Sequence, residues 1–284
     1  MSHPVLITDF DSTLVPWCFQ SKPREPRVGY YQLIDYVQTH QIPWYGTTGR
    51  SIEWVLSDPL LTNIRFDGIS CKVGTELWLP QDGGYKPCQK FVAWLKSHHR
   101  PGLHPYNVDH IKQVVESIVN ELDENGQPIF VGDSGNYCTD LLHGWEFHRP
   151  DKLPEYLEKL SKKLDLIDCR ISCSLGTSHY DLKKPIAIID ILHPRASKAS
   201  TLHYCETQHP DALLIFAGDS GNDIGAVDPN NPNHRIIVVG NAHDDFRQWV
   251  LDTIPKQARF IAPTNMEEAD AVIAGLKHFH EIKR

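Results

Sequence analysis

The chain of 284 residues is long enough for two domains, and its hydrophobic content of 40% and charged content of 23% are ordinary for a globular protein. Its formal net charge of -8 argues against a nucleic-acid-binding protein, since affinity for the phosphate backbone comes from clustered Lys and Arg. No apolar stretch is long enough to span a bilayer, and the first residues lack the pattern of a secretory signal. We therefore expect a cytoplasmic protein that binds neither nucleic acid nor membrane.

The first third of the chain alternates between short apolar runs and segments with helical spacing of apolar residues. This pattern predicts strands at residues 5–8 and 43–46, and a strand, turn and strand over residues 69–79. Helices are predicted at residues 30–40 and from residue 51 to the Asp-Pro pair that stops it. Such alternation is typical of an α/β fold with a parallel sheet and right-handed crossovers.

The pattern changes at residues 81–84, a turn-rich segment that we expect to join two domains. The next hundred residues predict several amphipathic helices together with strands, which is typical of an α+β arrangement. The predicted helices cover residues 91–98, 108–122 and 153–164, and the predicted strands cover residues 128–131 and 169–174.

The alternation of the first segment resumes in the last third of the chain. We expect a strand at residues 186–192, a helix after Lys198, a strand at 212–218, a helix after Asp223 and a strand at 236–239. The predicted organisation is therefore a Rossmann-like core made from residues 1–82 and 196–284, with a domain of residues 83–195 inserted into it.

Two carboxylates follow the first predicted strand, in the segment Asp9-Phe10-Asp11-Ser12-Thr13. A carboxylate at this position can attack phosphorus and form an acyl phosphate, and a second one two residues later points to the same side of an extended chain. Asp11 could then protonate the leaving oxygen and later deprotonate the attacking water. In isolation, this short pattern is more often a capped turn.

Two further segments could hold a phosphate. Thr48 and Gly49 come just after a predicted strand, where a hydroxyl and free N–H groups at a helix start form a cradle for phosphate oxygens. Lys198 could supply a fixed cation beside the phosphoryl group. Alone, the first segment is an ordinary helix start and the second an ordinary surface lysine.

A third acidic segment, Gly218-Asp219-Ser220-Gly221-Asn222-Asp223, follows the predicted strand at 212–218. Its carboxylates are hard oxygen ligands that suit Mg²⁺. Residues 132–136 repeat the sequence of residues 218–222, but only the later copy lies downstream of Lys198 and leads into a predicted helix. We therefore assign the metal site to the later copy and interpret the earlier one as a turn.

Each of these segments is common alone, but their occurrence together in one chain indicates a phosphate-transfer site. Each is expected at the carboxyl end of a parallel strand, where open α/β sheets bind ligands. The sequence contains neither the G-x-x-x-x-G-K-[ST] nucleotide loop nor the G-x-G-x-x-G dinucleotide fingerprint, so two common alternatives for an α/β sheet lose support. The combination predicts phosphoryl transfer through a covalent aspartyl phosphate.

In these motifs the chain resembles the haloacid dehalogenase (HAD) superfamily. The resemblance implies that Asp9 is the nucleophile and a metal ligand, and that Asp11 is the acid/base and offers its backbone carbonyl to Mg²⁺. It further implies that Asp219 and Asp223 complete the metal site. The residues expected to bind the substrate are Thr48, Gly49, Arg50, Lys198 and Asn222.

The long insertion after the second motif is similar to that of superfamily members with a C2-type cap. Within them, the segments Val73-Gly74-Thr75-Glu76 and Val239-Gly240-Asn241-Ala242 look like those of sucrose-phosphate phosphatases and related Cof-type sugar-phosphate phosphatases. One departure is Ala199, where relatives usually have Gly after the motif Lys. The resemblance covers the segments that form the core and not the cap.

We therefore expect a Mg²⁺-dependent phosphatase acting on a small phosphorylated sugar such as a sucrose 6-phosphate-like compound. In the cap, His179, Tyr180, Lys183 and Lys184 are candidates for contacts with sugar hydroxyls. Two alternatives stay open: a phosphomannomutase-like sugar phosphomutase, and a weakly active phosphatase-like module that partners a glycosyltransferase.

Overall fold

The computed structural model of the chain describes residues 3–16, 25–132, 138–177 and 185–281. The chain divides into two compact units. Unit 1 comprises Met1–Cys88 and Ser197–Arg284, and unit 2 comprises Gln89–Ala196. The cap residues 179, 180, 183 and 184 and most of the repeated segment at 132–136 lie outside the described residues.

Unit 1 is built on an eight-stranded sheet in the order β12-β11-β10-β1-β2-β3-β4-β5. The strands from β12 to β3 run parallel, and β4 and β5 extend the sheet in antiparallel fashion. The strands are β1 (Pro4–Asp9), β2 (Trp44–Thr47), β3 (Gly68–Cys71), β4 (Glu76–Gln81), β5 (Gly84–Pro87), β10 (Leu213–Gly218), β11 (His234–Val238) and β12 (Arg259–Ile261).

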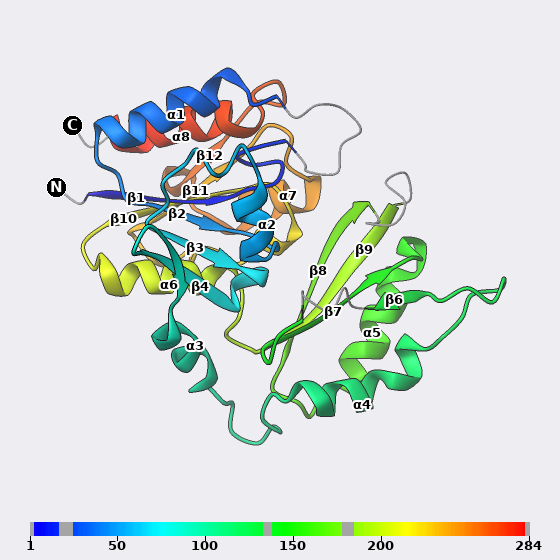
Figure 1. Ribbon diagram of the computed structural model, residues 1–284. Helices are drawn as coiled ribbons and strands as arrows, with labels where there is room; N and C mark the ends of the chain where they lie inside the picture. Colours follow the sequence, from blue (N-terminus) through cyan, green and yellow to red (C-terminus); the bar gives the residue numbers. More distant parts are fainter. Residues whose placement is uncertain (1–2, 17–24, 133–137, 178–184, 282–284) are drawn as a thin grey trace. The chain divides into compact units, whose positions relative to one another are not determined.

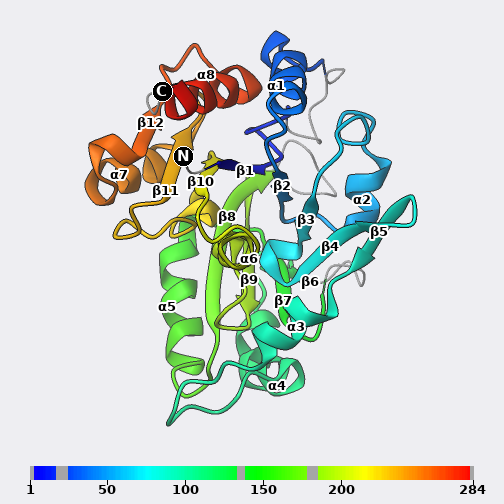
Figure 2. The same ribbon diagram turned by 90° about the vertical axis from the view of Figure 1, so that its left-hand side faces the viewer.

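Helices cover both faces of this sheet. The helices α1 (Val28–Thr39) and α8 (Glu268–Glu281) lie side by side on one face, and α6 (Lys198–Gln208) lies on the other (Figures 1 and 2). The helices α2 (Ile52–Ser57) and α7 (Asp244–Thr253) complete the unit. Because both faces are covered, β1 and β10 are buried along their whole length, as their continuous apolar sequences predict.

Unit 2 contains a four-stranded antiparallel sheet in the order β6-β7-β9-β8. One face of this sheet packs against α4 and α5 in an apolar core that contains several aromatic rings. Its elements are α3 (Gln89–Lys96), α4 (Val108–Val119), β6 (Phe130–Gly132), β7 (Leu142–Phe147), α5 (Leu153–Lys163), β8 (Arg170–Thr177) and β9 (Pro185–Leu192). Within the described parts of both units, no helix is long and apolar enough to cross a membrane.

The segment 81–84, predicted to join two domains, is instead a hairpin turn within unit 1. Asp82 and Gly83 both have positive φ angles, of 50° and 80°, and connect β4 to β5. Since β5 pairs with β4 throughout its length, unit 1 continues to Cys88. A turn signal marks a change of chain direction, and it does not distinguish a hairpin from a domain junction.

The strand predicted at residues 186–192 does not resume the parallel sheet. It is β9, which pairs antiparallel with both β7 and β8 in unit 2. Nearly all of β9 is buried, and a strand buried on both faces is a continuous apolar run in either kind of sheet, so its composition does not give its partners. Lys198 therefore does not follow a parallel strand, contrary to expectation, and begins α6.

The predicted helix after Asp223 is also absent from the described part of the chain between β10 and β11. A single 3-10 turn, η3 (Gly221–Asp223), is followed by turns up to β11. Gly225 has a φ of 77°, and Pro229 and Pro232 follow it, so the backbone cannot continue as a helix. The other 3-10 turns are Lys72–Gly74, Pro150–Lys152 and Lys256–Ala258.

Candidate active site

The end of β1 places two carboxylates on a tight turn. Asp9 is the last residue of the strand and is paired in register with Thr47 of β2. The chain then folds back at once, since the N–H groups of Leu14 and Val15 both donate to the Phe10 carbonyl. Ser12 has a positive φ of 59° in this turn. The turn fixes Asp11 just beyond the buried edge of the sheet.

The loop after β10 is organised around the Asp223 carboxylate. One of its oxygens accepts the N–H groups of Asp219 and Ser220, at 2.9 and 3.0 Å. A Cβ atom at Gly218 would lie 2.6 Å from the Asp223 carboxyl carbon, so a larger residue there would displace this carboxylate. The Thr13 hydroxyl donates to Asp219 over 2.9 Å and thereby joins this loop to the turn after β1.

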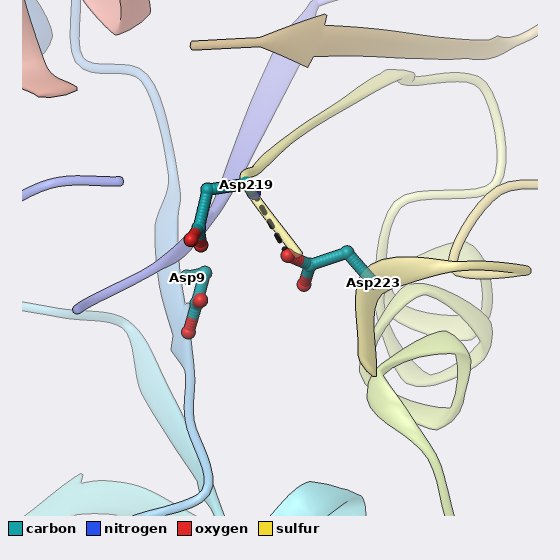
Figure 3. A group of neighbouring side chains, drawn as sticks. All are labelled: Asp9, Asp219 and Asp223. Carbon is teal, nitrogen blue, oxygen red and sulfur yellow. Dashed lines mark hydrogen bonds between the residues drawn. The ribbon is translucent and has the colours of Figure 1, made fainter. Parts of the chain in front are cut away.

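Three carboxylates therefore meet at the carboxyl end of the parallel strands. Oxygen atoms of Asp9, Asp219 and Asp223 lie within 4.8 Å of one another, and all three residues are buried. Figure 3 shows these side chains gathered from the end of β1 and the loop after β10, with the dashed bond from the Asp219 N–H to Asp223. Hard, closely spaced oxygen donors of this kind suit Mg²⁺.

Lys198 provides the cation of this group. Its ammonium lies 2.9 Å from Asp9 and 2.6 Å from Asp223, and its side chain is only 1% exposed. Burial alone would lower the pKa of Lys198, but the carboxylates of Asp223 and Asp9 outweigh burial, so its pKa lies above the ordinary value. The lysine is therefore charged at neutral pH and holds Asp9 in place.

The cluster nevertheless keeps an excess of negative charge, because one ammonium faces three carboxylates. Burial raises the pKa of Asp9 to about 6, with Lys198 opposing the rise. Burial also raises the pKa of Asp219 well above its usual range, and Asp9 and Asp223 add to this effect. Buried, uncompensated carboxylates are costly unless a cation joins them, so these residues fit a divalent metal ion.

The start of α6 is held in place by the segment that follows β3. Gly74 has a φ of 80°, and any Cβ atom there would collide with the carbonyl of Ser197. A capping box between Ser197 and Ser200 then begins the helix at Lys198. These contacts explain how Lys198 reaches Asp9 from the start of a helix, although the sequence predicts that Lys198 follows a strand.

The segment after β2 contributes a buried threonine and an arginine. Thr48 is 1% exposed; its N–H donates to the Ser70 carbonyl, and its hydroxyl accepts the N–H of Arg50. The guanidinium of Arg50 donates to the carboxylates of Asp11 and Asp58. The contact of Arg50 with substrate that the sequence predicts stays a prediction. The side chain of Asp11 is accordingly outside the three-carboxylate cluster.

The structure thus unites Asp9, Lys198, Asp219 and Asp223 directly, and places Thr48 just after Thr47, the residue of β2 that is paired with Asp9. A metal-ligand role for the Asp11 backbone carbonyl stays a prediction, as do substrate contacts of Gly49. Asn222 lies in η3, where its side chain accepts a hydrogen bond from Ser220. Its contact with substrate also stays a prediction.

Sequence reasoning named three supporting residues only as parts of motifs or as a helix stop and gave them no role in the site. Asn241 donates to the Ser12 carbonyl over 2.6 Å and accepts the N–H of Glu268, so it ties the turn after β1 to the start of α8. Thr13, which bonds Asp219, was noticed only as part of a motif. Asp58 was interpreted as a helix stop, and nothing in its sequence context signals that it binds Arg50.

Unit 2 carries buried polar groups on the sheet face opposite its apolar core. Trp145, Phe147 and Ile189 belong to the core, and side chains alternate along each strand. Glu146 of β7 and Asp190 of β9 therefore lie on the opposite face, and both are buried. Sequence analysis overlooked Glu146 because β7 was not predicted, and it gave no role to Asp190, which lies within the strand predicted at residues 186–192.

Comparison with known proteins gives a match to a family model over part of the chain, and a fold. A family model described as sucrose-6F-phosphate phosphohydrolase matches residues 146–280, which include Lys198, Asp219 and Asp223. No curated protein matches the sequence. Among solved structures, the sucrose-phosphatase of Synechocystis, in complex with sucrose and phosphate, has 19% identity and a TM-score of 0.69 over 99% of both chains.

Two other solved structures show the same fold. A haloacid dehalogenase-like hydrolase from Bacillus subtilis has 18% identity and a TM-score of 0.57, covering 98% of this chain and 92% of its own. A HAD subclass IIB sugar phosphatase has 15% identity and a TM-score of 0.57, covering 98% and 99%. The resemblance predicted from the motifs is confirmed: the chain has the fold of the HAD-type phosphoric monoester hydrolases and, over residues 146–280, the sequence pattern of the sucrose-phosphate phosphatases.

Proposed function

We propose that the protein is a Mg²⁺-dependent phosphatase that hydrolyses a small phosphorylated sugar through an aspartyl phosphate on Asp9. The observation that carries this proposal is the buried group of Asp9, Asp219 and Asp223 with a single lysine at the carboxyl edge of the parallel sheet. Neither a structural salt bridge nor a capped turn requires three carboxylates so close together in a buried place.

The residues suit a two-step transfer. In the first step the Asp9 carboxylate forms a bond to phosphorus, the bond from phosphorus to the sugar oxygen breaks, and Asp11 gives its proton to that oxygen. In the second step water attacks phosphorus, its proton passes to Asp11, and the bond to Asp9 breaks to release phosphate. With a pKa of about 6, Asp9 is mostly ionised at neutral pH and can act as the nucleophile.

The bound metal ion would neutralise charge on the phosphoryl oxygens. Asp9, Asp219 and Asp223 are the side chains that would hold it. Lys198 contributes a second positive charge beside Asp9, which favours approach of an anionic substrate and keeps the nucleophile oriented. Thr48, at the end of the neighbouring strand, is the candidate donor to the phosphate.

A phosphorylated sugar as the substrate is supported by the match to the family model and by the likeness to the sucrose-phosphatase solved with sucrose and phosphate. We assign recognition of the sugar hydroxyls to unit 2 as part of the proposal. This unit carries the buried carboxylates of Glu146 and Asp190, a group whose oxygens can accept hydrogen bonds from hydroxyl groups, and Glu146 already pairs with His148 over 3.0 Å.

The decisive experiment measures phosphate release from a panel of sugar phosphates with Mg²⁺ and with EDTA. We expect sustained release with Mg²⁺, strongest for a disaccharide phosphate such as sucrose 6-phosphate, and loss of release with EDTA. An isomerised sugar phosphate without release would instead indicate a phosphomutase. No turnover, or release that EDTA does not affect, would contradict the proposal.

A further inference from the structure

Arg50 binds the carboxylates of both Asp11 and Asp58, of which only Asp11 has a role in the proposed reaction. Its Nε donates to one oxygen of Asp11 over 2.6 Å, and a terminal nitrogen donates to the other Asp11 oxygen. The remaining terminal nitrogen donates to Asp58 over 2.6 Å. The arginine is 8% exposed and Asp58 is 5% exposed, so these bonds are shielded from water.

Both ends of this connection are fixed by the backbone. Asp58 accepts the N–H of Leu60 with its second carboxylate oxygen, and its carbonyl accepts the N–H groups of Leu61 and Thr62. The carbonyl of Arg50 accepts the N–H of Lys72. The guanidinium therefore has little freedom, and it presents a rigid pair of donors to Asp11.

The sequence predicts that Arg50 binds the phosphate, but its charge is already used. One guanidinium faces two carboxylates, so the group of Asp11, Arg50 and Asp58 carries a net negative charge when both carboxylates are ionised, and no net charge when Asp11 holds the proton that it gives in the first step. Such a group does not attract an anion. At least three of the five N–H donors of the guanidinium are also engaged by these carboxylates.

The turn after β1 fixes the backbone of Asp11, but the carboxyl group of Asp11 needs a hydrogen-bonding partner to hold its orientation. Asp11 lies after the end of β1, on a turn whose next residue, Ser12, has a positive φ. Each oxygen of a carboxylate offers two acceptor positions, so an oxygen bonded to Arg50 can still face a leaving group. We propose that Arg50, anchored by Asp58, is a positioning residue that aims the Asp11 carboxyl group, and is not a ligand of the substrate phosphate. This inference rests on the proposed function, in which Asp11 is the acid.

The inference predicts an effect that depends on the leaving group. A sugar oxygen leaves poorly unless it is protonated, whereas p-nitrophenolate leaves without a proton. The second step also uses Asp11 and is common to both substrates, so the comparison uses kcat/KM, which reports the first step. Misaiming Asp11 should lower kcat/KM for the sugar phosphate and leave kcat/KM for p-nitrophenyl phosphate nearly unchanged. A general loss of structure, or loss of phosphate binding, would slow both.

The experiment compares Arg50→Lys, Arg50→Gln and Asp58→Asn with the parent protein on both substrates, with Mg²⁺ present. For Arg50→Lys and Arg50→Gln we expect kcat/KM on the best sugar phosphate of the panel to fall about 10²-fold, the lower end of the effect of a general acid. For Asp58→Asn we expect a fall of about tenfold, because Arg50 stays in place but loses its anchor. On p-nitrophenyl phosphate kcat/KM of all three should stay within about threefold of the parent.

Inhibition by inorganic phosphate separates the two roles of Arg50. Its inhibition constant should change by less than about threefold in Arg50→Lys if the arginine only aims Asp11. Arg259→Lys is the matched control: Arg259 also makes several hydrogen bonds, but only to backbone carbonyls at the end of α7, and β11 and β10 separate its strand from β1. It should leave both rates unchanged.

Two results would overturn the inference while leaving the proposed function intact. One is an equal loss of kcat/KM on both substrates in the Asp58→Asn variant, which retains Arg50 and Asp11 and is the variant least expected to disturb folding. The other is a tenfold or greater weakening of phosphate inhibition in Arg50→Lys. A parent protein that hydrolyses neither substrate would overturn the proposed function and the inference with it.

Discussion

The two units of the chain differ in what their interiors contain: unit 1 buries a group of charged side chains, and unit 2 buries a group of aromatic rings. In unit 1, Asp9, Asp219, Asp223 and Lys198 are all buried at the carboxyl end of the parallel strands, beside a large apolar core. Their carboxylates outnumber the lysine, which costs folding free energy in the absence of a cation. The parallel strands tolerate this cost because the rest of the core is large and continuous.

Unit 2 has a smaller core whose centre is a group of aromatic rings. Phe147 is fully buried, and its ring centroid lies 4.9 Å from that of Phe130 and 5.0 Å from that of Tyr156. Stability in this unit depends on packing, as in most antiparallel sheets covered by helices on one face. Charge changes in unit 1 should therefore affect turnover, and packing changes in unit 2 should affect folding.

The largest expected effect is that of Asp9→Asn. Removing the nucleophile should lower kcat on any sugar phosphate by at least about 10⁴-fold, equivalent to more than about 5 kcal/mol in the barrier. The midpoint of thermal unfolding should not fall by more than about 4 °C, since a buried negative charge is removed from an excess. Activity within tenfold of the parent would remove the covalent mechanism.

The next test changes the packing of the core of unit 2, where we expect an effect on stability and not on turnover. Phe147→Ala should lower the free energy of unfolding by about 3–5 kcal/mol, because it leaves a cavity among the aromatic rings. Leu166→Ala is the matched control in the same unit, since Leu166 is 60% exposed, and should change it by less than about 0.5 kcal/mol. Urea unfolding measures both. Similar values for the two variants would mean that these rings do not form the core.

The third test concerns a histidine that unit 2 buries without charge. His193 is 5% exposed; burial lowers its pKa to about 4, although Asp168 opposes the shift. Between about pH 6.5 and pH 4 the unfolded chain binds a proton that the folded chain does not bind. The free energy of unfolding should therefore fall as the pH falls through this range, by at most about 3 kcal/mol.

The variant His193→Gln isolates this contribution, because glutamine does not titrate. The parent should lose more stability than the variant between pH 7 and pH 4, as measured by urea unfolding at each pH. Parallel curves for the two proteins would show that His193 is not held uncharged in the folded state.

The parallel sheet was predictable because its strands are continuous apolar runs that end in polar motifs. β1, β2 and β10 lie where the sequence places them, and their ends meet in the candidate site. β7 was not predicted: its six residues, Leu-His-Gly-Trp-Glu-Phe, mix polar and small residues with apolar ones. Which residues of β7 face the core is clear only once its two partner strands, β6 and β9, are known.

Within the site, residue types were predictable and their pairings were not. The motifs gave Asp9, Lys198 and Asp219 because the chemistry requires these groups. The bond between Arg50 and Asp58 depends on how α2 ends, and a sequence shows the charges but not which of them meet. The start of α6 illustrates the same limit, since Gly74 supports it from a segment more than a hundred positions earlier in the chain.

The smallest expected effect tests which copy of the repeated segment serves the metal. A ligand that binds only the folded protein at a hundred times its dissociation constant adds about 2.7 kcal/mol of stability. Mg²⁺ should therefore raise the thermal midpoint of the parent by roughly 5–10 °C. Asp219→Ala should abolish this rise, because Asp219 belongs to the buried carboxylate cluster.

The matched variant is Asp133→Ala, which removes the corresponding aspartate of the earlier copy, outside the described residues. It should leave the Mg²⁺-dependent rise in midpoint unchanged, because Asp9, Asp219 and Asp223 already provide three carboxylates for one ion. A rise that survives Asp219→Ala but disappears in Asp133→Ala would assign the metal to the other copy. Both variants lose one carboxylate from the same local sequence, so a difference between them reports position in the fold and not composition.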